Sequence, residues 1–377
     1  TDVLGVITSS IIRTNTETNL LLENLTSSSQ YEVYIEAYNY DSTLVAVSNL
    51  LPFDVLVAQK PLFHYIEYVT VNPDSGFIEL NCFVDNNIVI DHYDIYRSKI
   101  VNGTGVGLNL IDNVAFNGTS SFHYIDNKVS TSNYSYLYKT YPVDTCGITL
   151  NVPPVDDPAY ANDISYAQSI LLEVEVNKDY SNFPGLESDY TNTITFNKYD
   201  KWLGDVSKYE LFRSINNEPF VMLPIKTWDM DNNSNQELAF IDKVTEFGET
   251  NGKFCYYIKA TEGNNTPYGS VLEGSLSNIV CISQTPNIFV PNTFTPNGDE
   301  HNEVFRPIAY FVSEVGYSFS IFNRNGSEIF STNEPSKGWD GTYKGSNVQN
   351  DNYVYHLQYI NSDGELTHKT DAFTLVR

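Results

Sequence analysis

The feature that most constrains this chain is a strict alternation of side chains in its last quarter. Tyr353, Tyr355 and Leu357 occupy every second position, and the residues between them form a second set. Successive side chains of a β-strand point to opposite faces, so this period of two predicts a strand. Asn325-Gly326 and Asp340-Gly341 separate such runs, and both dipeptides accept the positive φ of tight hairpin turns. We therefore predict a small β-sandwich over residues 286–377.

The alternation continues to the last residue of the sequence. Phe373, Leu375 and Arg377 form one set, with Thr374 and Val376 between them. The sequence therefore ends inside a predicted strand. A terminal strand that is paired in a sheet is held in place, unlike the frayed ends of most domains. Truncating it is expected to damage the whole sandwich.

An internal repeat sets the organisation upstream. The segment Tyr-Asp-Ile-Tyr-Arg-Ser at residues 93–98 recurs as Tyr-Glu-Leu-Phe-Arg-Ser at 209–214, and Ile125-Asp126 recurs as Ile241-Asp242, both 116 residues later. Tyr138-Lys139 is matched to Ile258-Lys259 at an offset of 120, which predicts a four-residue insertion near residues 248–252. Self-similarity at a fixed period indicates repeated structural units. We predict two copies of one module, over residues 60–155 and 164–284, and both resemble fibronectin type III domains.

The rest of the chain fits the same organisation. A chain of 377 residues is too long for one sandwich, so three or four domains are expected. In residues 1–58, Leu25, Ser29 and Tyr31 resemble a corner in which a tyrosine hydroxyl bonds nearby backbone. This stretch is too short for seven strands, so it is expected to be a partial fibronectin type III-like domain of a longer, repetitive protein. Prolines at 153–154, 158 and 286 predict the linkers.

The predicted fold class is thus all-β, with tandem Ig/fibronectin type III-like β-sandwiches followed by a C-terminal β-sandwich. Composition agrees, because 28 Tyr and 21 Phe against 2 Met favour strands over helices. The formal charge of −26 argues against nucleic acid, since a phosphate backbone requires a basic patch. The same charge would repel an anionic lipid surface, and no apolar run approaches the roughly 18–20 residues of a membrane span. A basic-then-apolar signal peptide is also absent from the first residues, which suits a processed or cut N-terminus.

The four cysteines lack metal-ligand spacing, so zinc is not expected. Cys255 and Cys281 fall in neighbouring predicted strands, and Cys82 and Cys146 could bridge within the preceding module. Disulfides and buried free thiols both remain open for these pairs, because the sequence does not fix the geometry that a disulfide requires.

Segments that suggest chemistry have simpler explanations. The glycine-rich residues 103–107 lack the Gly-Lys-Ser/Thr of a phosphate loop, and the acidic residues 229–233 lack the later Gly and Glu of an EF-hand. The six histidines show no metal spacing, and no nucleophile signature is present. We therefore predict that these residues form no enzyme and need no cofactor. Trp339 could stack on a sugar, although a half-buried anchor is the favoured interpretation.

One acidic turn in the last domain is a candidate ion site. Asn297, Asp299, Asn302 and Glu303 cluster side-chain oxygens of the kind that bind calcium. The favoured alternative is a turn in which Asn297 and Asp299 accept hydrogen bonds from their own backbone.

Separated landmarks in the last domain together resemble a known family. They are Pro291, Asn292, Phe294, Pro296 and Asn297; Asn323, Arg324 and Gly326; Trp339, Asp340 and Gly341; Tyr353 and Tyr355; Leu375 and Arg377. In this order and at a chain end they resemble the gliding-motility-associated C-terminal domain of Bacteroidetes, the type B sorting signal of the type IX secretion system. The sequence departs from the family pattern at Glu300, Glu303, Asn325 and Asp371, where Gly, Asp, Trp and Gly are usual.

The resemblance implies a function for the whole chain. The last domain would be an export and surface-anchoring signal, and the landmark residues would carry its sorting contacts. The implied partners are the type IX translocon and an outer-membrane β-barrel of the family that accompanies type B substrates, with no direct insertion into the membrane. The final strand would contribute an open edge to that binding. The implied location is the cell surface, attached to the outer membrane.

Three interpretations remain for the complete protein. The first is a gliding adhesin whose fibronectin-like domains form a stalk and which contacts an extracellular polysaccharide or surface. The second is the non-catalytic tail of a secreted polysaccharide-degrading enzyme. The third makes the middle domains carbohydrate-binding modules, which exposed aromatic rows on one face would support.

Overall fold

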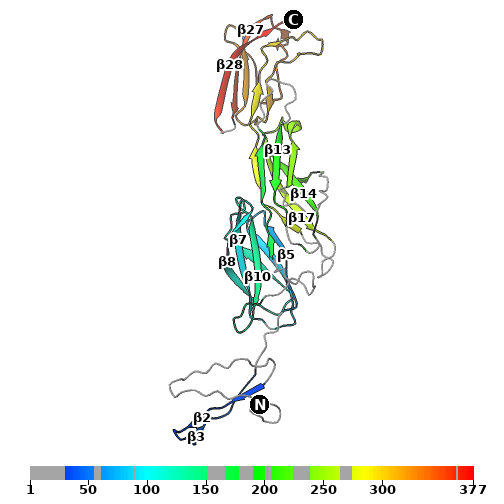
Figure 1. The fold of residues 1–377 in the computed structure, drawn as a ribbon. Helices are drawn as coiled ribbons and strands as arrows, with labels where there is room; N and C mark the ends of the chain where they lie inside the picture. The colour runs from blue at the N-terminus through cyan, green and yellow to red at the C-terminus, as the bar shows by residue number, and fades with distance from the viewer. Residues whose placement is uncertain are drawn as a thin grey trace.

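The computed structural model describes residues 30–54, 61–88, 90–150, 166–177, 190–199, 202, 205–223, 238–263, 274–361 and 364–377. These residues are nearly all strand, turn or extended chain, and their helical content is the single 3₁₀ turn Thr245–Phe247. Figure 1 shows three β-sandwiches following one another along an elongated molecule, with the C-terminus at the far end from the first strands. The predicted all-β fold class is confirmed.

The first described strands form two small antiparallel ladders. β1 (Gln30–Val33) pairs with β4 (Leu51–Asp54), and β2 (Glu36–Tyr38) pairs with β3 (Leu44–Val47). Tyr31 and Phe53 stack with ring centroids 5.8 Å apart, and most other side chains here are exposed. Leu25 and Ser29 of the predicted tyrosine corner lie outside the described residues.

The first module is a sandwich of three and four strands. One sheet contains β5 (His64–Val71), β6 (Ile78–Val84) and β9 (Ser121–Asp126). The other has the order β11-β10-β7-β8, from β7 (His92–Val101), β8 (Thr104–Ala115), β10 (Tyr136–Val143) and β11 (Tyr166–Gln168). β11 pairs with β10, so this sheet takes a strand from beyond residue 155, where the sequence placed the end of the module. The predicted linker prolines at 153–154 and 158 lie outside the described residues.

The second module repeats this arrangement. Its first sheet contains β12 (Leu172–Val176), β13 (Thr191–Phe196) and β16 (Leu238–Lys243). Its second sheet contains β14 (Val206–Ile215), β15 (Val221–Met222), β17 (Lys253–Glu262), β18 (Gly274–Leu276) and β19 (Val280–Ser283). β17 and β19 place Cys255 directly opposite Cys281, and the two form a disulfide. Cys82 is a buried free thiol and Cys146 an exposed one, so the second bridge is absent.

The register of the repeat differs from the sequence prediction at its third landmark. Arg97 faces Tyr138 across β7 and β10, and Arg213 faces Tyr256 across β14 and β17. Tyr256, 118 residues after Tyr138, is therefore its equivalent, and the predicted match to Ile258 was wrong. Every second residue of these strands is buried, so a slip of two residues preserves the pattern. The extra residues before this strand number two, not four.

The C-terminal sandwich is built on a five-stranded sheet. Its order is β21-β28-β27-β23-β24, from β21 (Thr293–Phe294), β23 (Ser318–Phe322), β24 (Glu328–Thr332), β27 (Asp351–Ile360) and β28 (Leu366–Leu375). β20 (Asn287–Phe289) pairs with β22 (Ile308–Tyr310), and β25 (Thr342–Tyr343) with β26 (Ser346–Asn347). Phe305, Phe319, Trp339 and Phe373 lie in the core between these layers.

Candidate functional site in the C-terminal sandwich

Five of the predicted landmarks, Phe294, Trp339, Tyr353, Tyr355 and Leu375, lie together in one aromatic core. Phe294 from β21 lies 5.5 Å from Trp339 between ring centroids, and Trp339 lies 5.2 Å from Tyr353. Phe305 and Phe373 stack at 3.6 Å. Trp339 is 1% exposed and donates its indole N–H to the Thr342 carbonyl at 2.8 Å. This tryptophan is therefore a buried anchor, and the sugar-stacking alternative is wrong.

Arg377 forms hydrogen bonds with the backbone of three loops. The Arg377 guanidinium donates from Nε to the Pro296 carbonyl at 3.2 Å, from Nη1 to the Val348 carbonyl at 2.5 Å and from Nη2 to the Gly341 carbonyl at 2.8 Å. Hydrogen bonds from a charged donor are stronger than those between neutral groups. Arg377 thus joins the landmarks around Pro296 and Gly341 to the end of β28.

Glycine at position 341 is required by this contact. Its φ is +79°, a region that side chains rarely adopt, and an added Cβ would lie 2.8 Å from Arg377 Nη2 and 3.0 Å from Pro296 Cγ. The preceding Asp340 carboxylate accepts from the Thr342 N–H at 2.9 Å and from its hydroxyl at 2.8 Å. The Trp-Asp-Gly landmark is therefore a turn that brings the backbone to Arg377.

The acidic turn directs its oxygens at its own backbone. Glu303 accepts from the Gly298 and Asp299 N–H groups at 2.7 and 2.9 Å, and Asn297 accepts from the Asp299 N–H at 3.1 Å. Asp299 accepts from the His301 N–H at 2.9 Å, a bond that lowers the pKa of its carboxyl group. Across the described residues, no three His, Cys, Asp or Glu side chains gather to hold a metal ion. Calcium at Asn297, Asp299, Asn302 and Glu303 stays a prediction.

The remaining landmarks divide between folding and surface positions. Asn323 accepts from the Asn325 and Ser327 N–H groups at 3.0 Å each, and Gly326 has a φ of +79° in the same turn. Arg324 is an exposed charged landmark, with a side chain that is 76% exposed and 3.5 Å from the Asp351 carboxylate. The buried landmarks are Phe294, Trp339, Gly341, Tyr353, Tyr355 and Leu375; Pro291, Pro296 and Asn323 are half-buried; Asn292, Asn297, Arg324, Gly326, Asp340 and Arg377 are exposed.

An open sheet edge runs along β28, the final strand for which an open edge was expected, although its residues 366–372 were not among the predicted site residues. β21 pairs with β28 only at Thr374 and Leu375. The Thr374 and Val376 N–H groups donate to Asn292 and Phe294 on that side, so the even-numbered residues of β28 point their main-chain groups away from β27. Along residues 366–372, the described part of the chain supplies no further strand on this side.

The open edge is exposed on its faces as well. Of residues 366–372, only Thr367 is half-buried and the rest are exposed. The Asp371 carboxylate accepts from the Ala372 N–H at 2.8 Å. His368, Lys369 and Thr370 are exposed, and the N–H groups of His368 and Thr370 point outward from the sheet. An edge of this kind can accept a strand from another chain.

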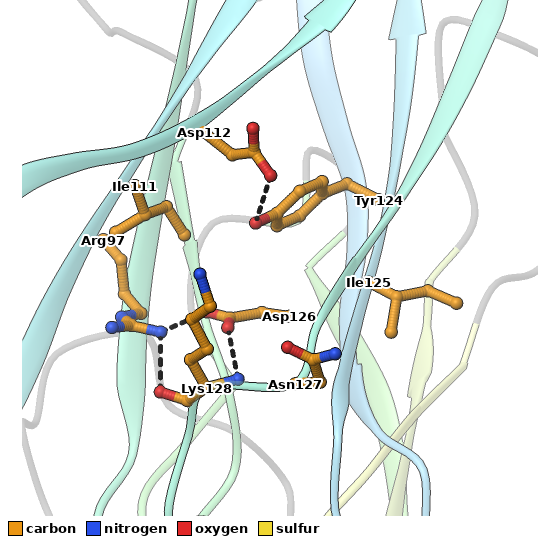
Figure 2. A pocket seen from close by; sticks show the side chains of 8 residues that line it. All are labelled: Arg97, Ile111, Asp112, Tyr124, Ile125, Asp126, Asn127 and Lys128. Carbon is orange, nitrogen blue, oxygen red and sulfur yellow. Dashed lines mark hydrogen bonds and ion pairs between the residues drawn. The ribbon is translucent and has the colours of Figure 1, made fainter.

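A polar pocket lies in the first module between β7, β8 and β9 (Figure 2). Arg97 donates to the Asp126 carboxylate at 2.5 Å and to the Lys128 carbonyl at 3.0 Å, and the Tyr124 hydroxyl lies 3.4 Å from Asp112. Tyr138 also donates to Asp126 at 2.8 Å, and its burial raises its pKa.

The second module repeats that polar group. Arg213 donates to Asp242 at 2.8 Å, and Tyr256 donates to it at 2.7 Å. Because both modules contain the same Arg-Asp-Tyr arrangement, it is part of how each sandwich is held together.

The described residues contain no helix long and apolar enough to cross a membrane.

Residues 288–374 match the family model described as the CHU_C type IX secretion signal domain. No curated protein matches the chain.

Three solved structures illustrate the more distant likenesses. A tetra-tandem repeat in the extending region of a large adhesion protein has 11% identity and a TM-score of 0.25, covering 93% of this chain and 82% of that one. Dimeric latent PorU from Porphyromonas gingivalis has 12% identity and a TM-score of 0.18, with coverage of 89% and 36%. The FN1–FN3 domains of chicken CNTN1 have 10% identity and a TM-score of 0.16, with coverage of 84% and 99%. These TM-scores are too low for an argument about fold or function.

Proposed function

We propose that this chain is the C-terminal part of a secreted cell-surface adhesin of Bacteroidetes. The match of residues 288–374 to a type IX secretion signal domain carries this proposal. The last sandwich acts as the export and surface-anchoring signal, and the two modules before it act as a stalk. The described residues serve structure and binding, not catalysis.

The sorting surface in this proposal is the open edge of β28 together with the adjoining loops. The outward N–H groups of His368 and Thr370 would bond an added strand, in the manner of β-strand addition. The aromatic core and the Arg377 contacts support this role by holding β28 rigidly at its other end. The proposed partners are the type IX translocon and an outer-membrane β-barrel that accompanies such substrates.

The carbohydrate-binding alternative finds less support. Phe212 and Tyr257 lie on the outer face of the second module, but their rings stack on each other with centroids 4.6 Å apart and planes 6° apart. Tyr96 and Tyr141 in the first module pack edge to face at 5.3 Å. These rings cover one another, whereas a sugar platform requires faces turned to solvent.

Export of a reporter tests the sorting role. A periplasmic reporter fused ahead of Thr1 should reach the surface of a host that has a type IX system and the barrel partner. Retention of this fusion in the periplasm, while the host still exports its own substrates, would overturn the proposal.

A substitution at the edge separates strand addition from other contacts. Thr370→Pro removes an outward N–H from β28, and proline is tolerated where a strand edge faces solvent. We expect at least a tenfold loss of export, whereas the matched control Thr370→Ala keeps the N–H and exports normally. Circular dichroism and thermal unfolding should show that both variants fold. Equal export of the two would refute strand addition at this edge and leave the sorting role intact.

A further inference from the structure

One residue of the C-terminal sandwich is buried in the core of the preceding module. Phe311 directly follows β22 and is 1% exposed. Its ring lies edge-on to Tyr190 at 5.0 Å and to Phe254 at 6.1 Å, both from the second module. Its N–H donates to the Gly248 carbonyl at 2.6 Å. Phe311 therefore packs with the module core and not with the aromatic core of its own sandwich.

The second module provides a site shaped for this insertion. A Cβ at Gly252 would lie 2.7 Å from Phe311 Cβ, and a Cβ at Gly248 would lie 2.3 Å from Tyr310 Cδ1. A side chain at either position would therefore force Tyr310 or Phe311 to shift. Asn287 adds a hydrogen bond from Nδ2 to the Tyr190 hydroxyl at 2.8 Å. The contact thus combines close backbone approach, ring packing and polar bonds.

The backbone of Phe311 also depends on the contact. Its φ is +58°, a conformation that a bulky L-residue adopts only when its surroundings hold it there. The Gly248 hydrogen bond and the surrounding rings supply that hold. The position of Phe311 is therefore fixed by the module as well as by its own sandwich.

A second junction, between the first and second modules, also contains aromatic side chains. The Tyr199 hydroxyl oxygen accepts a hydrogen bond from the Val69 N–H of β5 at 2.8 Å, and Trp202 donates its indole N–H to the Glu67 carbonyl at 2.5 Å. The Ser275 hydroxyl donates to the Val69 carbonyl at 2.7 Å. These groups cover the edge of β5 with the second module, whose rings Tyr199 and Trp202 pack at 3.9 Å.

We propose that these two junctions hold the two modules and the C-terminal sandwich together as one stiff rod. In a chain joined by flexible linkers the sandwiches would reorient freely, whereas here each junction buries aromatic side chains and satisfies backbone groups across the boundary. The rod fixes the direction in which the two modules extend from the C-terminal sandwich (Figure 1). This inference concerns shape and does not depend on the proposed export role.

Distances between spin labels test the rod in the full chain. Glu218→Cys in the second module and Asn325→Cys in the last sandwich are exposed label sites, with Cys146→Ser removing the exposed thiol. Electron–electron double resonance should give one narrow distance distribution. A broad distribution in the otherwise native chain would overturn the proposal.

Substitution of Phe311 tests whether its contact with the second module causes the stiffness. Phe311→Ser should at least double the width of the distribution, whereas Val315→Ser, at a side chain that is 74% exposed, should leave it unchanged. Near-ultraviolet circular dichroism should show that each sandwich stays folded. If Phe311→Ser unfolds the last sandwich, Phe311→Leu serves instead, with a smaller broadening expected. Unchanged widths in folded Phe311 variants would assign the stiffness elsewhere and refute the proposal.

Discussion

At the scale of single residues, the landmark motifs are explained by turns and close approaches. Gly341 and Gly345 offer a matched pair, since their φ values are +79° and +78°. A Cβ at Gly341 would meet Arg377 and Pro296, while a Cβ at Gly345 has nothing within 4 Å. Alanine at either site costs about 1 kcal/mol for the backbone conformation.

We therefore predict that Gly341→Ala destabilises the last sandwich more than Gly345→Ala does. The additional loss should be about 2 kcal/mol, because displaced Arg377 gives up charge-assisted hydrogen bonds. Urea unfolding of both variants measures the difference. Equal losses would mean that the Arg377 contacts contribute no stability.

A buried histidine in the first module makes its stability depend on pH. His64 is 0% exposed and donates from Nε2 to the Thr140 carbonyl at 2.7 Å, while its Nδ1 has no hydrogen-bond partner. Burial lowers the pKa of His64 from 6.5 to about 4. The unfolded chain therefore takes up a proton first as the pH falls.

The contribution of neutral His64 to the free energy of unfolding of the first module should be full above about pH 6.5. It should decrease progressively toward pH 4, by an amount on the order of 3 kcal/mol. Urea unfolding of the first module at several pH values measures this slope. His64→Leu should flatten the response between pH 6.5 and 4, whereas His123→Leu, at a side chain that is 43% exposed, should not. An unchanged slope in His64→Leu would assign the pH dependence to other groups.

At the scale of strands, the sequence predicts where strands lie better than it predicts which residues of two strands pair. Alternation located the strands around Tyr93, Tyr209 and Tyr353, because burial of one face repeats every two residues. The same period allowed the slip that matched Tyr138 to Ile258. The true register follows from the bond of Tyr138 to Asp126, which lies in the opposite sheet.

An open edge on the final strand was expected from the resemblance, but its extent could not be read from the sequence. Residues 366–372 lack the apolar–polar alternation of the buried strands, and their edge is open because β21 pairs with only two residues of β28. Likewise, Phe311 follows a strand in the last domain, and only the tertiary structure places it in the neighbouring module. Binding at the landmark residues stays a prediction, since their observed contacts serve the turns and the core.

The Cys255–Cys281 disulfide links β19 of the second module to β17. It closes a separation of 26 residues between β17 and β19, for which chain-entropy arguments give about 3 kcal/mol. Reduction should therefore lower hydrogen-exchange protection in β19 and leave β10 of the first module unchanged. Cys146→Ser under oxidising conditions should match the native chain. Equal protection of β19 in both redox states would show that its stability does not depend on the bridge.

At the scale of the whole molecule, the modules share hydrogen bonds as well as apolar surface. The Val69 N–H of β5 has its partner in Tyr199, a residue that follows β13 in the second module. Both groups are buried, so water is not available as a substitute. A buried donor without a partner costs about 1–3 kcal/mol.

Tyr199→Phe should therefore destabilise the first module although the substitution lies in the second. Amide exchange at Val69 should speed up by roughly tenfold to a hundredfold, since 1.4 kcal/mol corresponds to about a factor of ten. Exchange at Leu211, in the core of the second module, should change little. Tyr257→Phe, on the outer face of that module, is the matched control and should leave Val69 unaffected. If Val69 exchanges at its native rate in Tyr199→Phe, the modules are stable independently, and the junction orders them without stabilising either.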